Sequence, residues 1–309
     1  MGSVAEESQD LLDVLAQCRE RQAWYRDHAS GTGEGAVDVA GSVDRATGAV
    51  AAAASMREAL DFEVTRRRGS WSDASRRLAT NAEELGVLVM VSGVVGTNAR
   101  RKLDPEEFSG FALADELAPV VFVNGAAPRA LHLFAMAHAL AHVWLGETAV
   151  SRADPRQPRN GGDDVEPWCD DVAAEFAVPI DALEERFAPG EPLADTLVRL
   201  VRAFKVSPPV LLRRLHDGGL LEALSDVDDE YEALYDASLE RLVAEAAAKK
   251  GSGGGNFYNT QPVRVSKRFA RTVIASTMQG RTSDAAALQM LGVKSSATMK
   301  EMGRRLGVD

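Results

Sequence analysis

The stretch "FAMAHALAHVWLG", residues Phe134–Gly146, has the composition of a buried helix and yet carries two histidines. His138 and His142 are four residues apart, so a helix places both imidazoles on one face, where they can share one metal ion. Two core histidines held by hydrogen bonds are the alternative, but an apolar helix seldom stacks two polar side chains on the same face. The stretch therefore predicts a helix with half of a metal site.

The residue after the first histidine limits the chemistry of such a site. In zinc hydrolases with two histidines at this spacing, that residue is a glutamate that activates the bound water. Here it is Ala139, so the pattern is HAxxH rather than HExxH. A general base contributes roughly 10²–10⁴-fold to a rate, and alanine has no group that accepts a proton. We therefore expect a catalytically inactive site, in which Ala139 is either the natural residue or a substitution that traps a substrate.

A further ligand is expected downstream of the two histidines. The stretch "EPWCDDVAAEFAVP" begins another predicted helix 24 residues after His142, which leaves room for a loop and a return. Two histidines and one carboxylate, with the fourth position left to water, form a catalytic zinc arrangement rather than a closed structural one. The first turns of this helix offer four candidates: Glu166, Cys169, Asp170 and Asp171.

Three stretches follow one another in the order of a known family. They are "EEFSGFALADELAPVVFVN" (106–124), "LHLFAMAHALAHVWLG" (131–146) and "EPWCDDVAAEFAVP" (166–179). Together they resemble the ImmA/IrrE-like zinc metallopeptidases, which have an HExxH pattern, and the resemblance extends over about residues 71–179. Ala139 is the main departure from that family, because it removes the glutamate on which peptide hydrolysis depends.

The resemblance assigns roles to particular residues. It implies that Zn²⁺ is bound by His138, His142 and Glu166. It implies that Asp170 supports these ligands or replaces Glu166 among them. It also implies an edge strand beside the cleft, to which an extended substrate would add its backbone; the residues of that strand are Val121, Phe122, Val123 and Asn124.

The resemblance implies a cytoplasmic protease, linked to stress response and transcription regulation, that cleaves a helix-turn-helix repressor or an antitoxin. A natural pseudo-peptidase that binds zinc and a peptide as a sensor is a second hypothesis. A DNA-binding transcriptional regulator is a third. It rests on "FKVSPPVLLRRLHDGG" (204–219), which fits a helix-turn-helix only loosely, and on a basic C-terminal region.

Composition favours a fold of class α+β that is mainly helical, with a zincin-like core, a small sheet and C-terminal helical subdomains. Hydrophobic residues make up 45% of the 309 residues and aromatic residues only 6%, which suits helices packed through small side chains. Two buried strands are predicted, in "VLVMVSGVV" (87–95) and "APVVFVNG" (118–125). No apolar run is long enough to span a membrane and no signal peptide is apparent, so we expect a cytoplasmic protein.

The chain divides by composition into five parts. We predict an N-terminal helical region with a loop (1–69), the metallopeptidase core (70–180), a helical subdomain (181–250), a Gly/Ser linker (251–256) and a basic helical domain (257–309). From Asn256 onward, nine Lys/Arg face three Asp/Glu, a net charge of +6, whereas the whole chain carries −11. Residues 1–255 therefore carry −17, and we expect the two parts to attract each other.

Overall fold

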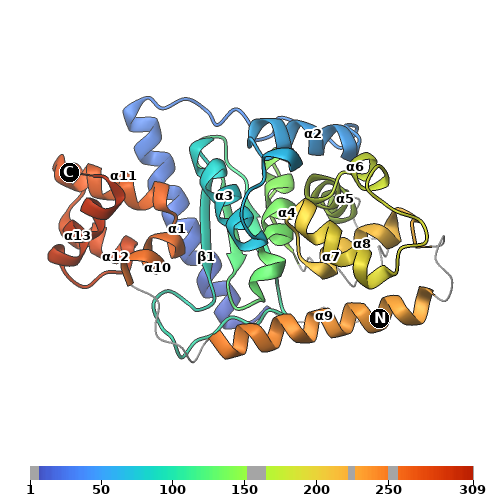
Figure 1. Ribbon diagram of the computed structural model, residues 1–309. Coiled ribbons are helices and arrows are strands. Elements are labelled where there is room, and N and C mark those ends of the chain that lie inside the picture. The colour runs from blue at the N-terminus through green and yellow to red at the C-terminus, as the bar shows by residue number, and fades with distance from the viewer. Residues whose placement is uncertain (1–6, 152–164, 222–226, 250–256, 309) are drawn as a thin grey trace.

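The computed structural model describes residues 7–151, 165–221, 227–249 and 257–308, and it is mainly helical with one small sheet (Figure 1). Within these ranges the strand order is β1-β3-β2-β4. β1 (Leu88–Ser92) runs parallel to β3 (Val120–Asn124); β2 (Gly110–Leu113) is antiparallel to β3, and β4 (Ala149–Ser151) is antiparallel to β2. The predicted α+β class with mostly helical content is confirmed.

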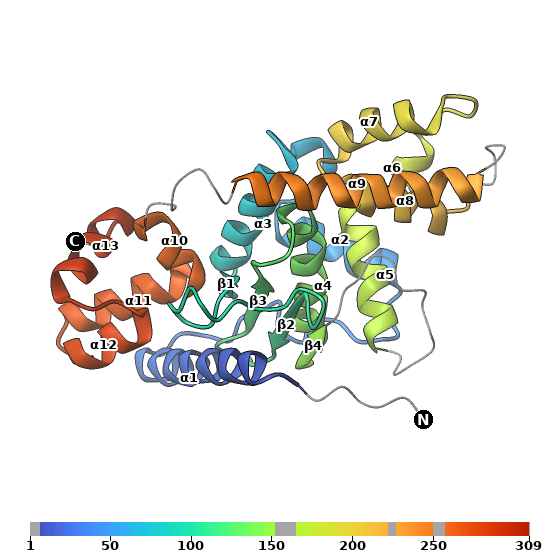
Figure 2. The ribbon, with the colours of Figure 1, turned by 90° about the horizontal axis from the view of Figure 1, so that it is seen from below.

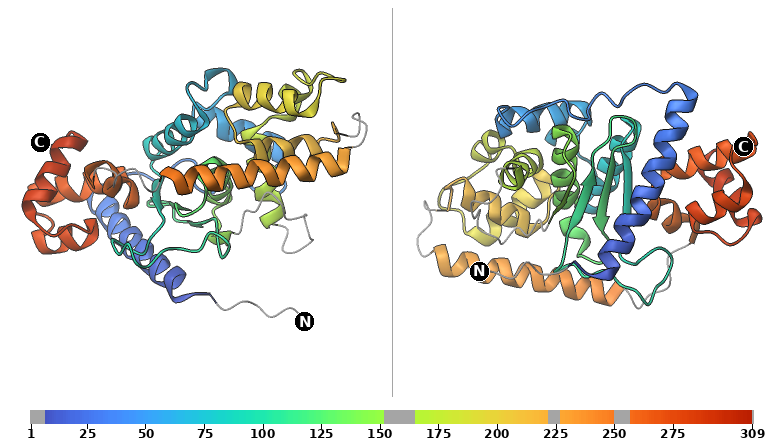
Figure 3. Two further views of the ribbon diagram at one scale, coloured as in Figure 1. Left: turned by 60° about the horizontal axis from the view of Figure 1, so that its bottom comes forward. Right: turned by 180° about the vertical axis from the view of Figure 1, so that it is seen from behind.

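Helices cover both faces of the sheet. α3 (Trp71–Glu84) and α4 (His132–Leu145) pack on one face, and α5 (Val165–Ala177) packs on α4 and on α2 (Ala49–Ala59). α1 (Gln9–Thr32) crosses the opposite face, as the view from behind shows (Figure 3). The helix that carries the two histidines therefore lies directly against the sheet.

Side chains of β3 alternate between the two layers. Val121 and Val123 belong to the core that includes α4, whereas Val120 and Phe122 belong to the core that includes α1. This is the two-residue period of a strand that is covered on both sides. The sheet thus separates two hydrophobic cores, and α4 packs against the face that carries Val121 and Val123.

The ends of the helices around the site follow from local sequence. Ser70 caps α3 and exchanges hydrogen bonds with Asp73, a capping box. α4 ends at Gly146, which adopts the left-handed conformation with φ 74° that favours glycine at this position. A short 3₁₀ turn (Arg129–Leu131) precedes α4. The histidines thus fall in the middle and last turns of a well-delimited helix.

The strand at Val121–Asn124 is not an edge strand, contrary to the expectation from the sequence. β3 has β1 on one side and β2 on the other, so its backbone groups are used on both sides. Phe122 faces the core that includes α1, Val121 and Val123 face the core that includes α4, and Asn124 is buried and bonds the carbonyls of Asp104 and Phe108. These four residues therefore cannot receive a substrate strand.

Four helices come after α5 in the chain and form a further layer. It comprises α6 (Ile180–Glu184), α7 (Leu193–Phe204), α8 (Pro208–Asp217) and the long α9 (Val227–Lys249). α7 and α8 are joined by three residues, pack against each other and bury apolar side chains in the core that also includes α4 and α5. In the view from below, α9 runs along α8 toward the C-terminal helices (Figure 2).

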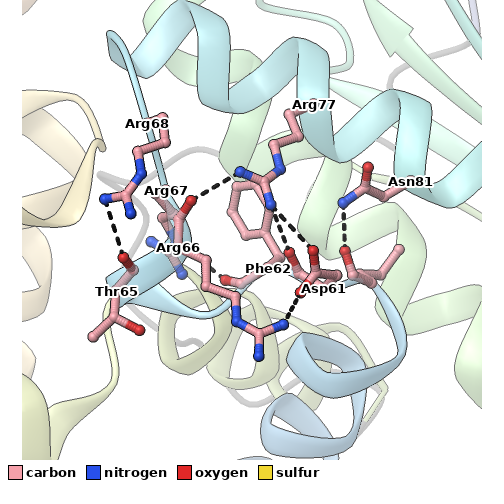
Figure 4. Close-up of polar contacts among 9 residues, drawn as sticks. Asp61, Phe62, Thr65, Arg66, Arg67, Arg68, Arg77 and Asn81 are labelled. Carbon is pink, nitrogen blue, oxygen red and sulfur yellow. Dashed lines mark hydrogen bonds and ion pairs between the residues drawn. The ribbon is translucent and has the colours of Figure 1, made fainter.

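A buried arginine joins this layer to α5. This arginine, Arg67, belongs to the loop that precedes α3. Arg77 on α3 holds that loop in place, because it donates to Asp61 and to the carbonyl of Arg66 (Figure 4). In the same loop, Arg67 donates to the carbonyls of Phe176 and Ala177 at the end of α5 and to that of Phe204 at the end of α7. Two helix C-termini, each with a partial negative charge, therefore converge on one guanidinium.

The C-terminal helices form a compact unit, residues 257–308, that we call the C-terminal unit. It consists of α10 (Phe257–Arg264), α11 (Lys267–Met278), α12 (Asp284–Leu291) and α13 (Ser296–Leu306). The unit packs beside α1 and β1 (Figures 1 and 2), and its core is continuous with that of α1. The predicted linker 251–256 lies outside the described residues.

A buried carboxylate holds the C-terminal unit to α3. Glu83, at the end of α3, accepts hydrogen bonds from the Ser266 hydroxyl at 2.6 Å and from the backbone N–H of Lys267 at 2.7 Å. Arg268 donates in return to the carbonyl of Glu83 and to the hydroxyl of Tyr25. The carboxylate thus lies at the N-terminus of α11, where the helix dipole favours a negative charge.

Among the described residues, no helix is long and apolar enough to cross a membrane.

Candidate metal centre

α4 presents two histidine side chains toward α5. His138 and His142 are 1% and 0% exposed, and their Nε2 atoms lie 3.1 Å apart. The separation follows from the helix itself, since residues four apart lie one turn above each other. At this distance the two nitrogens can share one hydrogen bond, and two lone pairs at the same separation can share a cation.

Glu166, in the first turn of α5, completes a cluster of three. Its Oε2 lies 3.2 Å from Nε2 of His138, and its Oε1 lies 3.1 Å from Nε2 of His142. Ligand atoms about 2.0–2.1 Å from a tetrahedral zinc ion are separated from each other by roughly 3.3 Å. The three side chains therefore fit a zinc ion, and among the described residues they are the one His/Cys/Asp/Glu group close enough to hold a metal.

Asp170 lies one turn further along α5 and contacts the opposite edge of the first histidine. Its Oδ1 is 2.8 Å from Nδ1 of His138. A carboxylate in this position accepts the Nδ1 proton, which leaves the lone pair of Nε2 free for a metal and fixes the ring orientation. Asp170 thus lies where a supporting residue is expected, and Glu166 is the carboxylate that faces both histidines.

The second histidine is held less tightly. Nε2 of His142 lies 3.4 Å from the hydroxyl of Ser151 on β4, and its Nδ1 is buried without a hydrogen-bond partner among the described residues. The contact with Ser151 places the end of β4 beside the cluster. β4 is an edge strand, because within the described residues it pairs only with β2.

The electrostatics of the cluster favour a positive charge. Burial by itself lowers the pKa of His138, but the carboxylates of Asp170 and Glu166 outweigh it and raise the pKa to about 9. Burial tends to raise the pKa of Glu166, yet the two histidines bring it down to about 2. At neutral pH Glu166 is therefore ionised and His138 carries a proton, which a bound metal ion would displace because a ligating imidazole is neutral.

Ala139 lies next to the cluster on α4 and is 1% exposed. Two carboxylates are close, but each is engaged: Glu166 faces the two Nε2 atoms, and Asp170 lies on the far edge of the His138 ring. Neither is placed to accept a proton from water opposite the ligands. Among the described residues of the cluster, no carboxylate is placed to take over the role of the missing glutamate.

The other candidates from the sequence lie apart from the cluster. Cys169 is fully buried in the core, and burial raises the pKa of its thiol far above the usual range, which keeps it protonated. Asp171 is a neighbour on α5 that does not belong to the group of three. His132, at the start of α4, hydrogen-bonds the carbonyl of Ala127 and has no part in the site.

Sequence profiles of known domain families match two parts of the chain. The profile described as the IrrE N-terminal-like domain matches residues 82–216, and a domain of unknown function (DUF8813) matches residues 265–305. The chain carries the ImmA/IrrE-like peptidase domain. The resemblance seen in the sequence is thereby confirmed, and this family is one of zinc-dependent metallopeptidases. Neither a curated protein nor a solved structure gives a match to the chain.

The ImmA/IrrE-like domain contains the whole candidate site. Its matched range begins at the end of α3 and ends in α8, so it includes the four strands, α4 and α5. The second matched range covers α11 to α13, most of the C-terminal unit. α1 and α2 lie outside both ranges, although α1 covers one face of the sheet and α2 packs on α5.

Proposed function

We propose that this chain binds Zn²⁺ through His138, His142 and Glu166 and acts as a base-less ImmA/IrrE-type peptidase, which binds a protein substrate without cleaving it efficiently. The observation that carries the proposal is the convergence of three side chains: the two Nε2 atoms lie 3.1 Å apart, and each lies 3.1–3.2 Å from one oxygen of the Glu166 carboxylate. A zinc ion held there would lower the pKa of water and polarise a peptide carbonyl.

The proposed inactivity rests on the proton that hydrolysis must move. Water that attacks a peptide carbonyl gives up a proton, and the leaving amine has to gain one. In HExxH sites one glutamate serves both transfers, and here alanine stands in its place. Since Glu166 and Asp170 are engaged with the histidines, we expect cleavage to be slower by at least about a hundredfold.

The free edge of β4 supports a place for the substrate. An extended peptide can add its backbone to an exposed strand. Ala149–Ser151 form such an edge within the described residues, and Ser151 lies 3.4 Å from a nitrogen of His142. A peptide paired with β4 would run past the cluster. We propose a regulatory protein, of the helix-turn-helix repressor or antitoxin class, as the substrate.

The structure offers less support for a DNA-binding function of α7 and α8. Arg213 pairs with Asp217, and Arg214 pairs with the buried Glu175. Both arginines on α8 are thus engaged within the protein, whereas contacts to DNA need cations that are free to meet phosphates. A pseudo-peptidase that senses a peptide shares the zinc site and differs only in its response to a restored glutamate.

The test compares two substitutions at one position. Ala139→Glu restores the carboxylate, and Ala139→Gln adds a side chain of the same size that cannot act as a base. Each variant is incubated with candidate repressors and antitoxins from the same genome, with zinc or with a chelator. Cleavage by Ala139→Glu alone, abolished by the chelator, is the expected result. If Ala139→Glu binds zinc and a partner but leaves that partner intact, the pseudo-peptidase hypothesis is favoured instead.

A further inference from the structure

A hollow lies on the side of the sheet that faces away from the metal centre. It measures about 280 Å³ and lies in the seam between α1, the loop that follows β1, and the C-terminal unit. Its volume is close to the lower limit of small-molecule sites, which corresponds to a ligand of metabolite size. Because its walls come from segments far apart in the sequence, the hollow exists only when the C-terminal unit is docked.

Gln261, a residue of the C-terminal unit, lines this hollow and has a buried carbonyl oxygen without a donor among the described residues. Gln261 on α10 is 2% exposed, and its Nε2 donates to the carbonyl of Leu291 at 2.9 Å. That bond fixes the amide orientation and leaves Oε1 buried without a partner among the described residues. A buried acceptor without a donor is costly, so a ligand that supplies an N–H would be stabilised there.

One helical turn from Gln261, the same helix presents a cation. Arg264 is half-buried and lines the hollow, and no hydrogen bond or ion pair joins its guanidinium to the described residues. Across the seam, Arg21 on α1 uses Nε to bond the carbonyl of Met290 and also lines the hollow. Two arginines that line one hollow, in a chain of net charge −11, offer donors and positive charge to an anion.

The remaining walls are apolar or closely fitted. Phe122 of β3 and Val14 of α1 line the interior. Gly292, in the turn between α12 and α13, has φ 63°, and a Cβ there would come within 2.9 Å of Nε2 of Gln261. The turn therefore comes very close to α10, and it closes the hollow on that side. Glu20 is an exposed carboxylate at the rim, so the anion is expected further inside, at the arginines.

We propose that this hollow, which we call the seam site, binds a small metabolite that carries an anionic group and an N–H donor. The anion would pair with Arg264 and Arg21, and the donor would bond Oε1 of Gln261. Residues three apart on a helix have Cβ atoms roughly 5–6 Å apart, so one ligand of metabolite size can reach both side chains. Such a ligand would bridge the C-terminal unit and α1.

Titration calorimetry on the full-length chain tests this proposal with three probes. L-Glutamine carries a carboxylate and an amide N–H at a suitable distance, and O-phosphoethanolamine carries a phosphate and an ammonium group. Inorganic phosphate has the anion without the donor. We expect saturable one-to-one binding of glutamine or phosphoethanolamine, which identifies the anion as carboxylate or phosphate, and at least about tenfold weaker binding of inorganic phosphate.

Two variants on the C-terminal unit assign the binding to the seam site. Arg264→Gln removes a cation that makes no hydrogen bond or ion pair with the described residues, so the fold should persist while affinity falls about tenfold or more. Lys300→Gln removes an exposed cation from α13, outside the hollow, and should leave the affinity unchanged. Gln261→Met is expected to abolish the preference over inorganic phosphate, because the acceptor is lost.

The proposal is overturned if neither glutamine nor phosphoethanolamine binds, or if Arg264→Gln and Lys300→Gln weaken binding equally. Zinc-free protein provides a further comparison. Equal affinity before and after removal of the metal agrees with a site behind the sheet, whereas loss of binding with the metal would place the ligand at His138 and His142 and contradict the proposal. The seam site can therefore fail or hold independently of the peptidase function.

Discussion

At the scale of single residues, the two nitrogens of His138 contact different carboxylates. His138 turns Nε2 toward Glu166 and Nδ1 toward Asp170, and this division follows from two carboxylates placed one turn apart on α5. The carboxylate at Glu166 meets both histidines, while the one at Asp170 meets only His138. The sequence alone allows either Glu166 or Asp170 to be the third ligand. In the structure their contacts differ, so we expect substitutions of the two acids to affect metal binding differently.

Asp170→Asn should weaken zinc binding about 10–100-fold without abolishing it, because the amide still contacts the ring but no longer accepts its proton as strongly. Glu166→Gln should remove a ligand and reduce the affinity much further. Competition with a chromogenic chelator measures both affinities. If Asp170→Asn loses zinc more completely than Glu166→Gln, Asp170 is the ligand and the assignment made here is wrong.

At the scale of elements, α5 is held at both ends by different chemistry. Its first turn carries the acids that face α4, and its last carbonyls accept hydrogen bonds from Arg67 at 2.6 Å and 2.9 Å. Burial lowers the pKa of Arg67 to about 9, so the guanidinium remains charged at neutral pH. Its positive charge is attracted to the partial negative charges at the C-termini of α5 and α7. The position of α5 beside α4 therefore depends on a loop far from the cluster.

Arg67→Met should lower the free energy of unfolding by about 3 kcal/mol, because it leaves several buried carbonyls without a donor. Its neighbour Arg68 is exposed and bonds only the carbonyl of Thr65 among the described residues (Figure 4), so Arg68→Met is a matched control with an expected effect below about 0.5 kcal/mol. Urea denaturation followed by circular dichroism measures both. Equal effects for the two variants would contradict the structural role of Arg67.

The contact between α3 and α11 should make stability depend on pH. Burial raises the pKa of Glu83 above its ordinary value of 4.5, although hydrogen bonds from Ser266, Lys267 and Arg268 counteract this. Between 4.5 and the raised pKa, the folded protein retains a proton that the unfolded chain has lost, so the contribution of Glu83 to stability declines as pH rises.

Glu83→Gln cannot titrate at this position and serves as the reference for that prediction. The stability of the original chain relative to Glu83→Gln should be highest below pH 4.5 and should fall as pH increases through the raised pKa. Thermal melts of both proteins in a series of buffers provide the measurement. A difference that stays constant with pH, or grows in favour of Glu83, would show that the pKa is not raised.

At the scale of the whole molecule, the sequence predicted some features well and others not at all. The helix that carries the two histidines could be predicted because the spacing of its own residues determines it. The edge position of Val121–Asn124 was wrong, because β2 is a four-residue strand with no clear signal and its pairing covers β3. The seam site was not foreseen, since it depends on the contact of segments more than 200 residues apart.

The shared core of α1 and the C-terminal unit predicts cooperative unfolding. Phe269, Val273 and Met302 pack in the same cluster as Leu11 and Val14, so neither part buries its apolar surface alone. A chain that ends after Lys249 should expose this surface and show a lower melting temperature or aggregation. Calorimetry of the full-length protein should show one transition, whereas two transitions, the first abolished by the truncation, would indicate independent folding of the unit.

The most direct test of the central claim is the zinc content of the full-length protein, purified without chelator and measured by plasma mass spectrometry. The original chain should contain about one zinc per chain, and His138→Ala and Glu166→Gln should contain little. Ala139→Gln should retain the metal, because position 139 provides no ligand. Well under one zinc in the original chain, with no further change in His138→Ala, would contradict the account.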